Sequence, residues 1–246
     1  MRLHIGMNAD RWGEILNSLH KVARGDENIS MDLNVIGKND DRALIYVRNY
    51  DTLQVIHSIE NSDSAIVEVN EPTKLVFDSQ VLHTVVQRAG DRELDLRFGE
   101  HEFEVEIGQE TFSSATEFNL RLVQDSEFQE PLNIQGYEEI VEVNRTELLQ
   151  NLKMLLSISK VVNFSTEGDE LTISVSDKVQ GSGELQIGID NGLIDVEASY
   201  PIRPIRDFLD KMKSDTVKIF MTPKKTIKIQ SASTGRISSI QRAERL

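Results

Sequence analysis

The sequence predicts an α+β fold with two similar β-rich domains, each built from antiparallel sheets with two helices on one face. Three observations support this prediction. Apolar residues mostly alternate with polar ones in short segments separated by turn residues, as in strands with one buried face. Four longer segments have helical spacing instead. The order strand, helix, strands, helix, strands occurs twice in the 246 residues, which indicates a duplicated architecture.

The first domain is expected at residues 1–124. Residues 2–7 alternate as a strand, and Asn8 is a suitable N-cap for a helix over 8–24. The buried face of that helix would carry Trp12, Ile15, Leu16, Leu19, Val22 and Ala23. A second helix is predicted at 79–89. The strands of this domain are predicted near 28–35, 42–49, 52–60, 65–69, 73–78, 93–98, 102–107 and 117–123.

The second domain, residues 139–246, repeats this order. A strand at 139–143 leads to Asn144, which can cap a helix over 144–160 while Glu147 reaches back to the cap residue. A shorter helix over 200–213 has Pro204 in its first turn, where the missing N–H removes no hydrogen bond. The remaining strands are predicted near 161–166, 170–176, 184–190, 193–199, 216–221, 225–230 and 236–240.

Residues 125–138 connect the two domains. Their polarity, their Pro and Gly residues and their lack of either period mark them as a connecting loop. The loop nevertheless carries Phe128, Leu132, Ile134 and Tyr137. These side chains either pack onto nearby strands, as in an ordinary linker, or line a groove for a partner.

Charge is distributed unevenly along the chain, whose net charge is −14. The segments 8–24, 79–92, 144–160 and 200–213 hold 12 of the 27 Lys and Arg but only 6 of the 41 Asp and Glu. The helices therefore carry +6 and the rest of the chain −20. A protein this acidic should repel nucleic acid, so cations gathered on helices indicate one surface that tolerates a polyanion.

Several classes of protein are disfavoured. The chain has no cysteine, which excludes disulfides, thiolate metal sites and a cysteine nucleophile. It has no apolar run near the ~20 residues that cross a bilayer, and its first residues alternate like a strand rather than a signal peptide, so we expect an intracellular protein without a membrane segment.

Candidate catalytic groups are few. Glu102, Glu104 and Glu106 follow His101 on one face of a strand, where a solvated acidic face is expected rather than a cation site. The segment Gly181-Ser182-Gly183 lacks the lysine of a phosphate loop and is interpreted as a hairpin turn. The other histidines, His4, His20, His57 and His83, have no ligand spacing. We predict a protein that is not an enzyme and needs no cofactor or metal.

Several stretches resemble the proliferating cell nuclear antigen (PCNA) family of DNA sliding clamps, and the similarity covers nearly the whole chain. Thr73-Lys74-Leu75-Val76-Phe77-Asp78-Ser79 through Gln87-Arg88-Ala89-Gly90-Asp91 is similar to that family's strand, second helix and Ala-Gly turn. Val161-Val162-Asn163-Phe164-Ser165 through Gly183-Glu184-Leu185-Gln186-Ile187 is similar to the start of its second-domain sheet. Asp215-Thr216-Val217-Lys218-Ile219 and Gly235-Arg236-Ile237-Ser238-Ser239-Ile240 are similar to its closing strands.

The resemblance implies a homotrimeric ring that encircles double-stranded DNA without reading its sequence, with helices lining the channel and sheets forming the outer wall. Residues expected to face DNA are Lys21, Arg24, Arg88, Arg92, Lys153, Arg203, Arg206, Lys211 and Lys213. The side chains of Lys21, Arg206 and Lys213 are expected to be solvated. The strand over 117–123 should pair with that over 184–190 of a neighbouring copy, because a head-to-tail contact closes into a ring. This interface would contain Phe118, Leu120, Leu122, Leu185 and Ile187.

The resemblance also implies that a DNA polymerase, a clamp loader, a flap endonuclease and a DNA ligase dock through short peptide motifs. The walls of the partner pocket would be Leu53, Phe128, Leu132, Ile134, Ile240 and Ala243. The family usually ends in an Ala-Pro-basic sequence, whereas this chain has Gln241-Arg242-Ala243-Glu244-Arg245, which implies a reshaped or weaker pocket.

Three functions remain open at this point. The chain is a sliding clamp that tethers a polymerase, a clamp-like scaffold that acts as a monomer or heteromer, or a β-rich enzyme that processes carbohydrates or nucleotides. Retention on circular but not on linear DNA, and the mass in solution, distinguish them.

Overall fold

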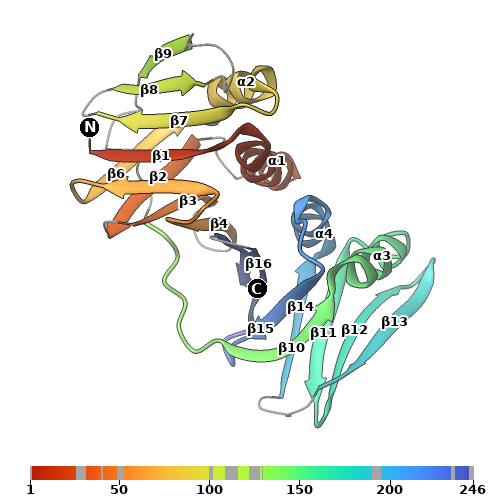
Figure 1. The fold of residues 1–246 in the computed structure, drawn as a ribbon. Coiled ribbons are helices and arrows are strands. Elements are labelled where there is room, and N and C mark those ends of the chain that lie inside the picture. Colours follow the sequence, from red (N-terminus) through yellow and green to blue (C-terminus); the bar gives the residue numbers. More distant parts are fainter. Residues whose placement is uncertain are drawn as a thin grey trace.

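The structure is a computed structural model that describes residues 2–25, 32–39, 41–48, 53–99, 102–108, 116–121, 128, 130–189, 195–233 and 236–243. Its helices and strands follow one another in the order that the sequence predicts (Figure 1). The predicted α+β fold with antiparallel sheets is confirmed. Residues 28–31 of the predicted strand over 28–35 lie outside the described residues.

The first half contains two helices, α1 (Ala9–Gly25) and α2 (Ser79–Ala89). Its strands are β1 (Leu3–Asn8), β2 (Asp32–Asn39), β3 (Arg42–Arg48), β4 (Leu53–Glu60), β5 (Ala65–Val69), β6 (Thr73–Asp78), β7 (Glu93–Phe98), β8 (Glu102–Ile107) and β9 (Thr116–Arg121).

The second half contains α3 (Arg145–Leu156) and α4 (Ile202–Lys211). Its strands are β10 (Glu138–Asn144), β11 (Val161–Glu167), β12 (Glu170–Asp177), β13 (Gly181–Gly188), β14 (Val196–Pro201), β15 (Thr216–Met221), β16 (Thr226–Ser233) and β17 (Arg236–Ala243).

Local sequence signals explain where the first helix of each half begins. The Asn8 side chain accepts a hydrogen bond of 2.8 Å from the amide of Asp10, and the Asn144 side chain accepts one of 3.0 Å from the amide of Glu147. Each bond satisfies an amide that the helix itself leaves without a partner. Both predicted N-caps are therefore confirmed.

The hairpin between β12 and β13 turns three residues earlier than predicted. The turn lies at 178–180, where the Asp177 carboxylate accepts hydrogen bonds from the amides of Val179 and Gln180 at 2.8 and 2.9 Å. Gly181 then begins β13 with a φ of 101°, a value that suits glycine. The prediction of a turn over Gly181-Ser182-Gly183 was wrong because an aspartate that caps the turn outweighed the glycines.

Three antiparallel sheets hold the strands. A five-stranded sheet has the order β5-β1-β7-β8-β9, and a four-stranded sheet has the order β13-β12-β11-β14. The eight-stranded central sheet, β10-β15-β16-β17-β4-β3-β2-β6, runs through both halves. It does so because β17 pairs with β4, with Arg236 opposite Ile59 and Arg242 opposite Leu53. The sequence pattern did not predict this junction.

The two halves repeat one topology. The strands β10-β15-β16-β17 correspond to β1-β7-β8-β9, and β14-β11-β12-β13 correspond to β6-β2-β3-β4. In this repeat β17 therefore corresponds to β9, and β4 corresponds to β13. Among the described strands, β9 pairs with β8 alone and β13 with β12 alone, so each lies at the edge of its sheet.

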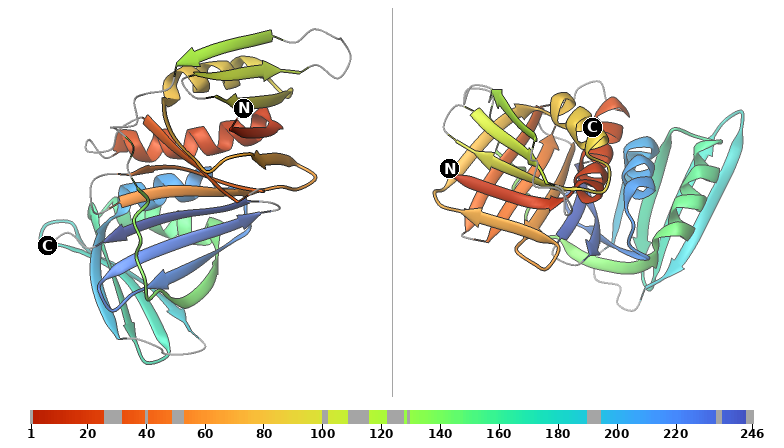
Figure 2. Two further views of the ribbon diagram at one scale, coloured as in Figure 1. Left: turned by 90° about the vertical axis from the view of Figure 1, so that its left-hand side faces the viewer. Right: turned by 45° about the horizontal axis from the view of Figure 1, so that its top comes forward.

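The helices form a row in the order α2, α1, α4, α3, with α1 in contact with α2 and α4, and α3 in contact with α4. Figures 1 and 2 show this row on one side of the sheets and the two edge strands β9 and β13 at opposite ends of the molecule. None of the described helices is long and apolar enough to span a membrane.

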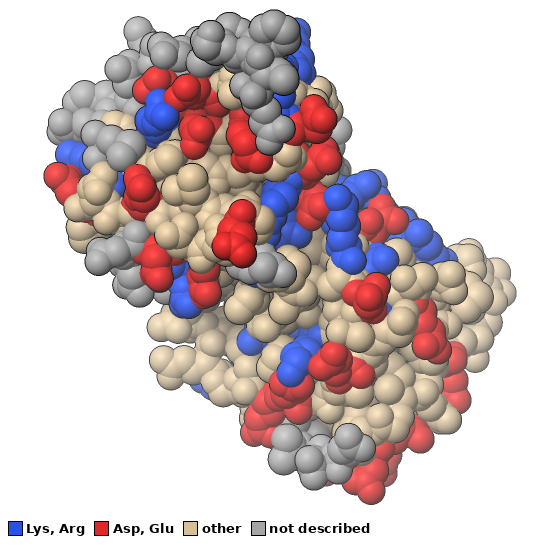
Figure 3. All heavy atoms as spheres, in the orientation of Figure 1, with Lys and Arg blue, Asp and Glu red and all other residues tan. Residues whose placement is uncertain are grey.

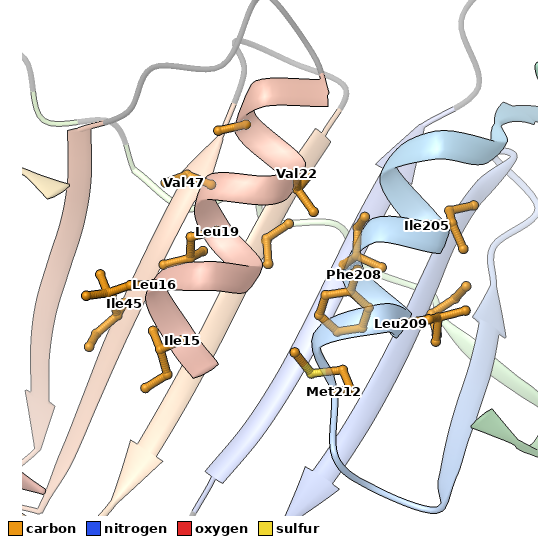
Figure 4. Close-up of a cluster of buried hydrophobic side chains, with 14 of the residues drawn as sticks. Ile15, Leu16, Leu19, Val22, Ile45, Val47, Ile205, Phe208, Leu209 and Met212 are labelled. Carbon is orange, nitrogen blue, oxygen red and sulfur yellow. The ribbon is translucent and has the colours of Figure 1, made fainter. Parts of the chain in front are cut away.

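Apolar side chains hold α1 and α4 in this row. Leu16 and Leu19 of α1 point toward the sheet, while Phe208 of α4 and Met212, directly after α4, point toward the side of α1 that carries Val22 (Figure 4). All five are buried, and full burial of such a side chain stabilises the fold by about 1.5–3 kcal/mol. The apolar stripes of the helices thus face inward and leave their charged stripes on the opposite side.

Candidate nucleic-acid interface

The charged side chains of the helical row are concentrated where α1 and α4 meet. In Figure 3, blue side chains gather over this junction with red ones among them. The cations come from three helices and the residues after α4: Lys21, Lys153, Arg203, Arg206, Lys211 and Lys213. The fold therefore brings together six of the nine residues expected to face DNA.

Asp210 binds three of these cations at once. Its carboxylate lies 2.6 Å from the Nζ of Lys21 on α1, 3.3 Å from that of Lys153 on α3 and 3.5 Å from that of Lys211 on α4. The hydrogen bond from Lys21 is the largest cause of a pKa for Asp210 of about 2. The group is therefore an anion at any physiological pH, and it links three helices.

Asp207 has the same role one turn earlier. Only 2% of its side chain is exposed, and its carboxylate lies 3.8 Å from Arg203 and 3.9 Å from Lys21. It also accepts hydrogen bonds from the guanidinium of Arg206. A buried carboxylate without such partners would be costly, so Asp207 holds these cations in place.

Glu14 on α1 is the third carboxylate of this surface. It pairs with Lys213, and one of its oxygens lies 2.6 Å from the buried guanidinium of Arg236 at the start of β17. Burial by itself would raise the pKa of Glu14, but hydrogen bonds from Lys213 and Arg236 outweigh it and lower the pKa below its usual value. The six cations and Arg236 thus face three carboxylates, which leaves an excess of positive charge.

Solvated side chains were expected for Lys21, Arg206 and Lys213, and this is wrong for the first two. Arg206 and Lys21 keep 24% and 34% of their side-chain surface exposed, and both are ion-paired. Lys213 and Arg203 are more open, at 71% and 63%. The sequence count of net charge could not reveal this pairing, because Lys21 and Asp210 are 189 positions apart.

The remaining expected cations lie elsewhere. Arg92 donates to the carbonyl oxygens of Ala89 at 2.6 Å and Arg88 at 2.9 Å, so it caps the end of α2. Arg88 itself is exposed. The side chain of Arg24 lies outside the described residues. Sequence analysis also missed Arg145, which donates to the carbonyl oxygen of Leu209 at the end of α4.

The connecting loop lies against the outer face of the central sheet. Phe128 packs edge-on against Tyr46 of β3, with ring centroids 6.4 Å apart, and belongs to an apolar cluster with Ile36, Leu44 and Ile56. Its side chain therefore faces the sheet of its own chain. This is the packing expected of an ordinary linker at this position.

Gln54 of β4 fixes the middle of the loop. Its amide nitrogen donates to the carbonyl oxygen of Leu132 at 3.2 Å, and its oxygen accepts from the amide of Leu132 at 2.9 Å. The same nitrogen donates to Gln241 of β17 at 2.9 Å. Leu132 and Ile134 remain half-buried, so part of each side chain is open to a partner.

Two of the expected pocket walls belong to the core instead. Leu53 is fully buried and Ile240 is 2% exposed, because both point from the central sheet toward the helices. A ligand on the outer face would not touch them. The side chain of Ala243 lies outside the described residues. Beside the loop, the Nζ of Lys228 lies 4.7 Å from the ring centroid of Tyr137 and 4.0 Å from that of Phe220.

The expected subunit interface lies on the two edge strands. Leu185 and Ile187 of β13 are half-buried and pack against the core. A cavity of about 210 Å³ opens between this strand and the first turn of α3. Phe118 and Leu120 belong to β9 by their backbone, but their side chains, and the whole of Leu122, lie outside the described residues.

The acidic strand face forms ion pairs rather than a cation site. Arg97 of β7 lies 2.6 Å from Glu106 and 3.7 Å from Glu104 of β8. Within the described part of the chain, no three His, Asp or Glu side chains are arranged to hold a metal ion.

Comparison with known proteins supports the fold. No protein-family description matches the sequence, and no curated protein has a matching sequence. The structure is similar to that of PCNA from Thermococcus kodakaraensis, with a TM-score of 0.78 and 16% identity over 99% of this chain and 100% of that one. At this identity the likeness concerns the fold alone, which is that of a PCNA-like clamp.

Proposed function

We propose that this protein is a DNA sliding clamp. Three copies form a ring around duplex DNA, and the ring tethers a polymerase and other DNA-processing enzymes inside the cell. The mechanism is topological, so it needs no catalytic group and no base contacts, and weak contacts with phosphate suffice. The likeness in fold to PCNA supports this proposal.

The pairing of β17 with β4 is the observation that carries the proposal. It joins two repeats within one chain through strands whose counterparts, β9 and β13, are the edges at opposite ends of the molecule. The same contact can therefore form between β9 of one copy and β13 of the next. Such a head-to-tail contact removes both exposed edges and repeats until the ring closes.

The repeat also predicts the register of this contact. Asn8 and Asn144 precede corresponding helices, and the strand pairings that follow place Phe118 at the position of Ile240. Asp78 and Pro201 likewise precede the corresponding helices α2 and α4, which places Gly183 at the position of Val55. Ile240 lies opposite Val55 in the junction within the chain. Phe118 should then lie opposite Gly183 of the neighbouring copy.

The helical row supplies the surface for DNA. It lies on one side of the sheets, and its excess of cations contrasts with the acidic remainder of the chain. Closure of the ring through β9 and β13 would place this row on the inner wall. The outer face, with the connecting loop, would then remain open to a clamp loader, a polymerase, a flap endonuclease or a ligase that binds through a short peptide.

Retention on circular DNA tests the proposal. Subunits are diluted until they dissociate, reassembled with nicked circular DNA on beads and washed with high salt, which screens phosphate contacts. The ring should stay on the circle and be released when a restriction enzyme cuts it. Loss from intact and cut DNA alike would contradict the proposal. Light scattering should give three times the mass of the chain, whereas a monomer would favour the scaffold function.

A further inference from the structure

The carboxylates of the helical row bind the same cations that, under the proposed function, would contact DNA phosphates. Asp210 touches three lysines, and Asp207 touches Lys21 and two arginines. Lys21, Lys153 and Lys211 lie within 3.5 Å of Asp210, and Arg206 donates a hydrogen bond to Asp207. Four of the six cations are therefore already paired with a carboxylate of α4. A phosphate that approaches this surface has to share or displace that anion.

We infer that Asp207 and Asp210 act as competing anions, which keep the contact between the helical surface and DNA weak and short-lived. The inference rests on the proposed function and goes beyond it, because it assigns a role to acidic residues on the surface that faces a polyanion. Their side chains restrain the cations and reduce the effective number of phosphates that the surface neutralises.

The number of unpaired cations determines how strongly the helical surface holds DNA. Affinity for duplex DNA rises with each phosphate neutralised, and its logarithm falls with the logarithm of salt concentration by about 0.9 per contact. Six unpaired cations per copy would give a closed ring a strong hold on the backbone. Asp207 and Asp210 lower this excess by two charges per copy, so the ring stays bound by its topology while it remains free to move.

Asp210 is the residue through which this effect can be measured. It is 26% exposed, so its replacement leaves no buried cavity, whereas Asp207 is 2% exposed and supports the packing of α4. Asp210 also lies between lysines of α1, α3 and α4, so one substitution releases cations on three helices.

The test compares Asp210→Asn with wild type in binding to a short fluorescent duplex over a range of salt. The variant should bind roughly three- to tenfold more tightly at 50 mM salt, with a salt slope steeper by about one, because it neutralises about one more phosphate. If the asparagine variant does not fold, Asp210→Ser removes the same charge. Wild-type affinity and slope in the folded variant would overturn the inference.

Two controls separate charge from other effects. Asp210→Glu keeps the charge and should behave as wild type. Glu167→Gln removes an exposed carboxylate at the turn between β11 and β12 and should also leave binding unchanged. An equal gain in Glu167→Gln would attribute the effect to net charge and overturn the local role.

Failure of this inference can be distinguished from failure of the clamp proposal. Retention on closed circles without a change in Asp210→Asn would leave the clamp standing and remove this inference. A gain in duplex affinity without retention on circles would support the competing anions and contradict the clamp.

Discussion

The imidazole of His57 joins three elements inside the protein. Its Nε2 lies 2.7 Å from the hydroxyl of Ser18 on α1, and its Nδ1 lies 2.8 Å from the hydroxyl of Ser238 on β17. Burial, and to a lesser degree the charge of Arg236, lower its pKa well below 6.5. The ring is therefore neutral in the folded protein, at the point where the two halves meet.

This histidine should make the fold sensitive to acid. Below pH 6.5 the unfolded chain takes up a proton at His57 that the folded chain does not, so stability falls by up to about 1.4 kcal/mol per pH unit. His57→Gln should lower the melting temperature at pH 7.5 but show a shallower loss between pH 6.5 and 5.5. Parallel melting curves for the two proteins would contradict this role.

His4 serves as a control, because its contribution to stability should change with pH in the opposite direction. A hydrogen bond of 2.7 Å to Asp95 is the main cause of its raised pKa, which burial partly opposes. Its contribution is present below pH 6.5 and is lost as the pH rises through its folded-state pKa. His4→Gln should therefore lose stability more steeply than wild type on acidification.

Residue patterns predicted the caps and the buried helix faces, because both depend on neighbours within a few positions. The same reasoning missed the carboxylates that pair with the cations expected to face DNA. Arg203 and Asp207 are four positions apart, so this pair could have been found from helical spacing. The pair of Lys21 and Asp210 depends on how α1 packs against α4, which no local pattern encodes.

At the scale of elements, the connecting loop packs on the sheet with part of its length and leaves two apolar side chains partly exposed. Phe128 and the backbone of Leu132 are held by β3 and β4, which fixes the loop along the outer face. Leu132 and Ile134 stay half-exposed beside it. The two interpretations of the loop therefore apply to different residues. Phe128 packs as in an ordinary linker, and a partner groove remains a prediction for Leu132 and Ile134.

A peptide titration tests this groove. The resemblance to PCNA implies a ligand with a glutamine and two aromatic residues, and we expect Leu132→Ser with Ile134→Ser to weaken its binding roughly tenfold or more, because each lost apolar contact costs about 1 kcal/mol. Calorimetry measures the affinity. Ile66→Ser, which alters an exposed apolar residue on β5, should bind as wild type. Equal affinity for the double variant would leave the loop as a linker only.

At the scale of the whole molecule, the strands were predictable but their partners were not. Period-two alternation shows which face of β4 or β17 is buried, yet it does not show that these strands pair across 181 positions, from His57 to Ser238. The number of strands in a sheet depends on such distant pairings. Only the order of the strands in the sheets identifies β9 and β13 as edge strands.

The register of those edges allows the ring to be tested by a cross-link. In the junction within the chain, Gln54 lies opposite Gln241 and their side chains are hydrogen-bonded at 2.9 Å. By the repeat, Ser182 corresponds to Gln54 and Asn119 to Gln241, so residues 182 and 119 of neighbouring copies should be opposite each other. The natural chain has no cysteine, so cysteines introduced at both positions have no other partner.

Mild oxidation of a chain with Asn119→Cys and Ser182→Cys should therefore give covalent dimers, then trimers, and no longer products, because the third bond closes the ring. Either single variant should stay uncross-linked, since its cysteine faces a serine or an asparagine. Shifting one cysteine to Glu184 should abolish the cross-link, as that position is two residues out of register. A ladder that extends beyond trimers would mean that the head-to-tail contact forms an open filament, and the absence of any cross-link would mean that β9 and β13 do not pair.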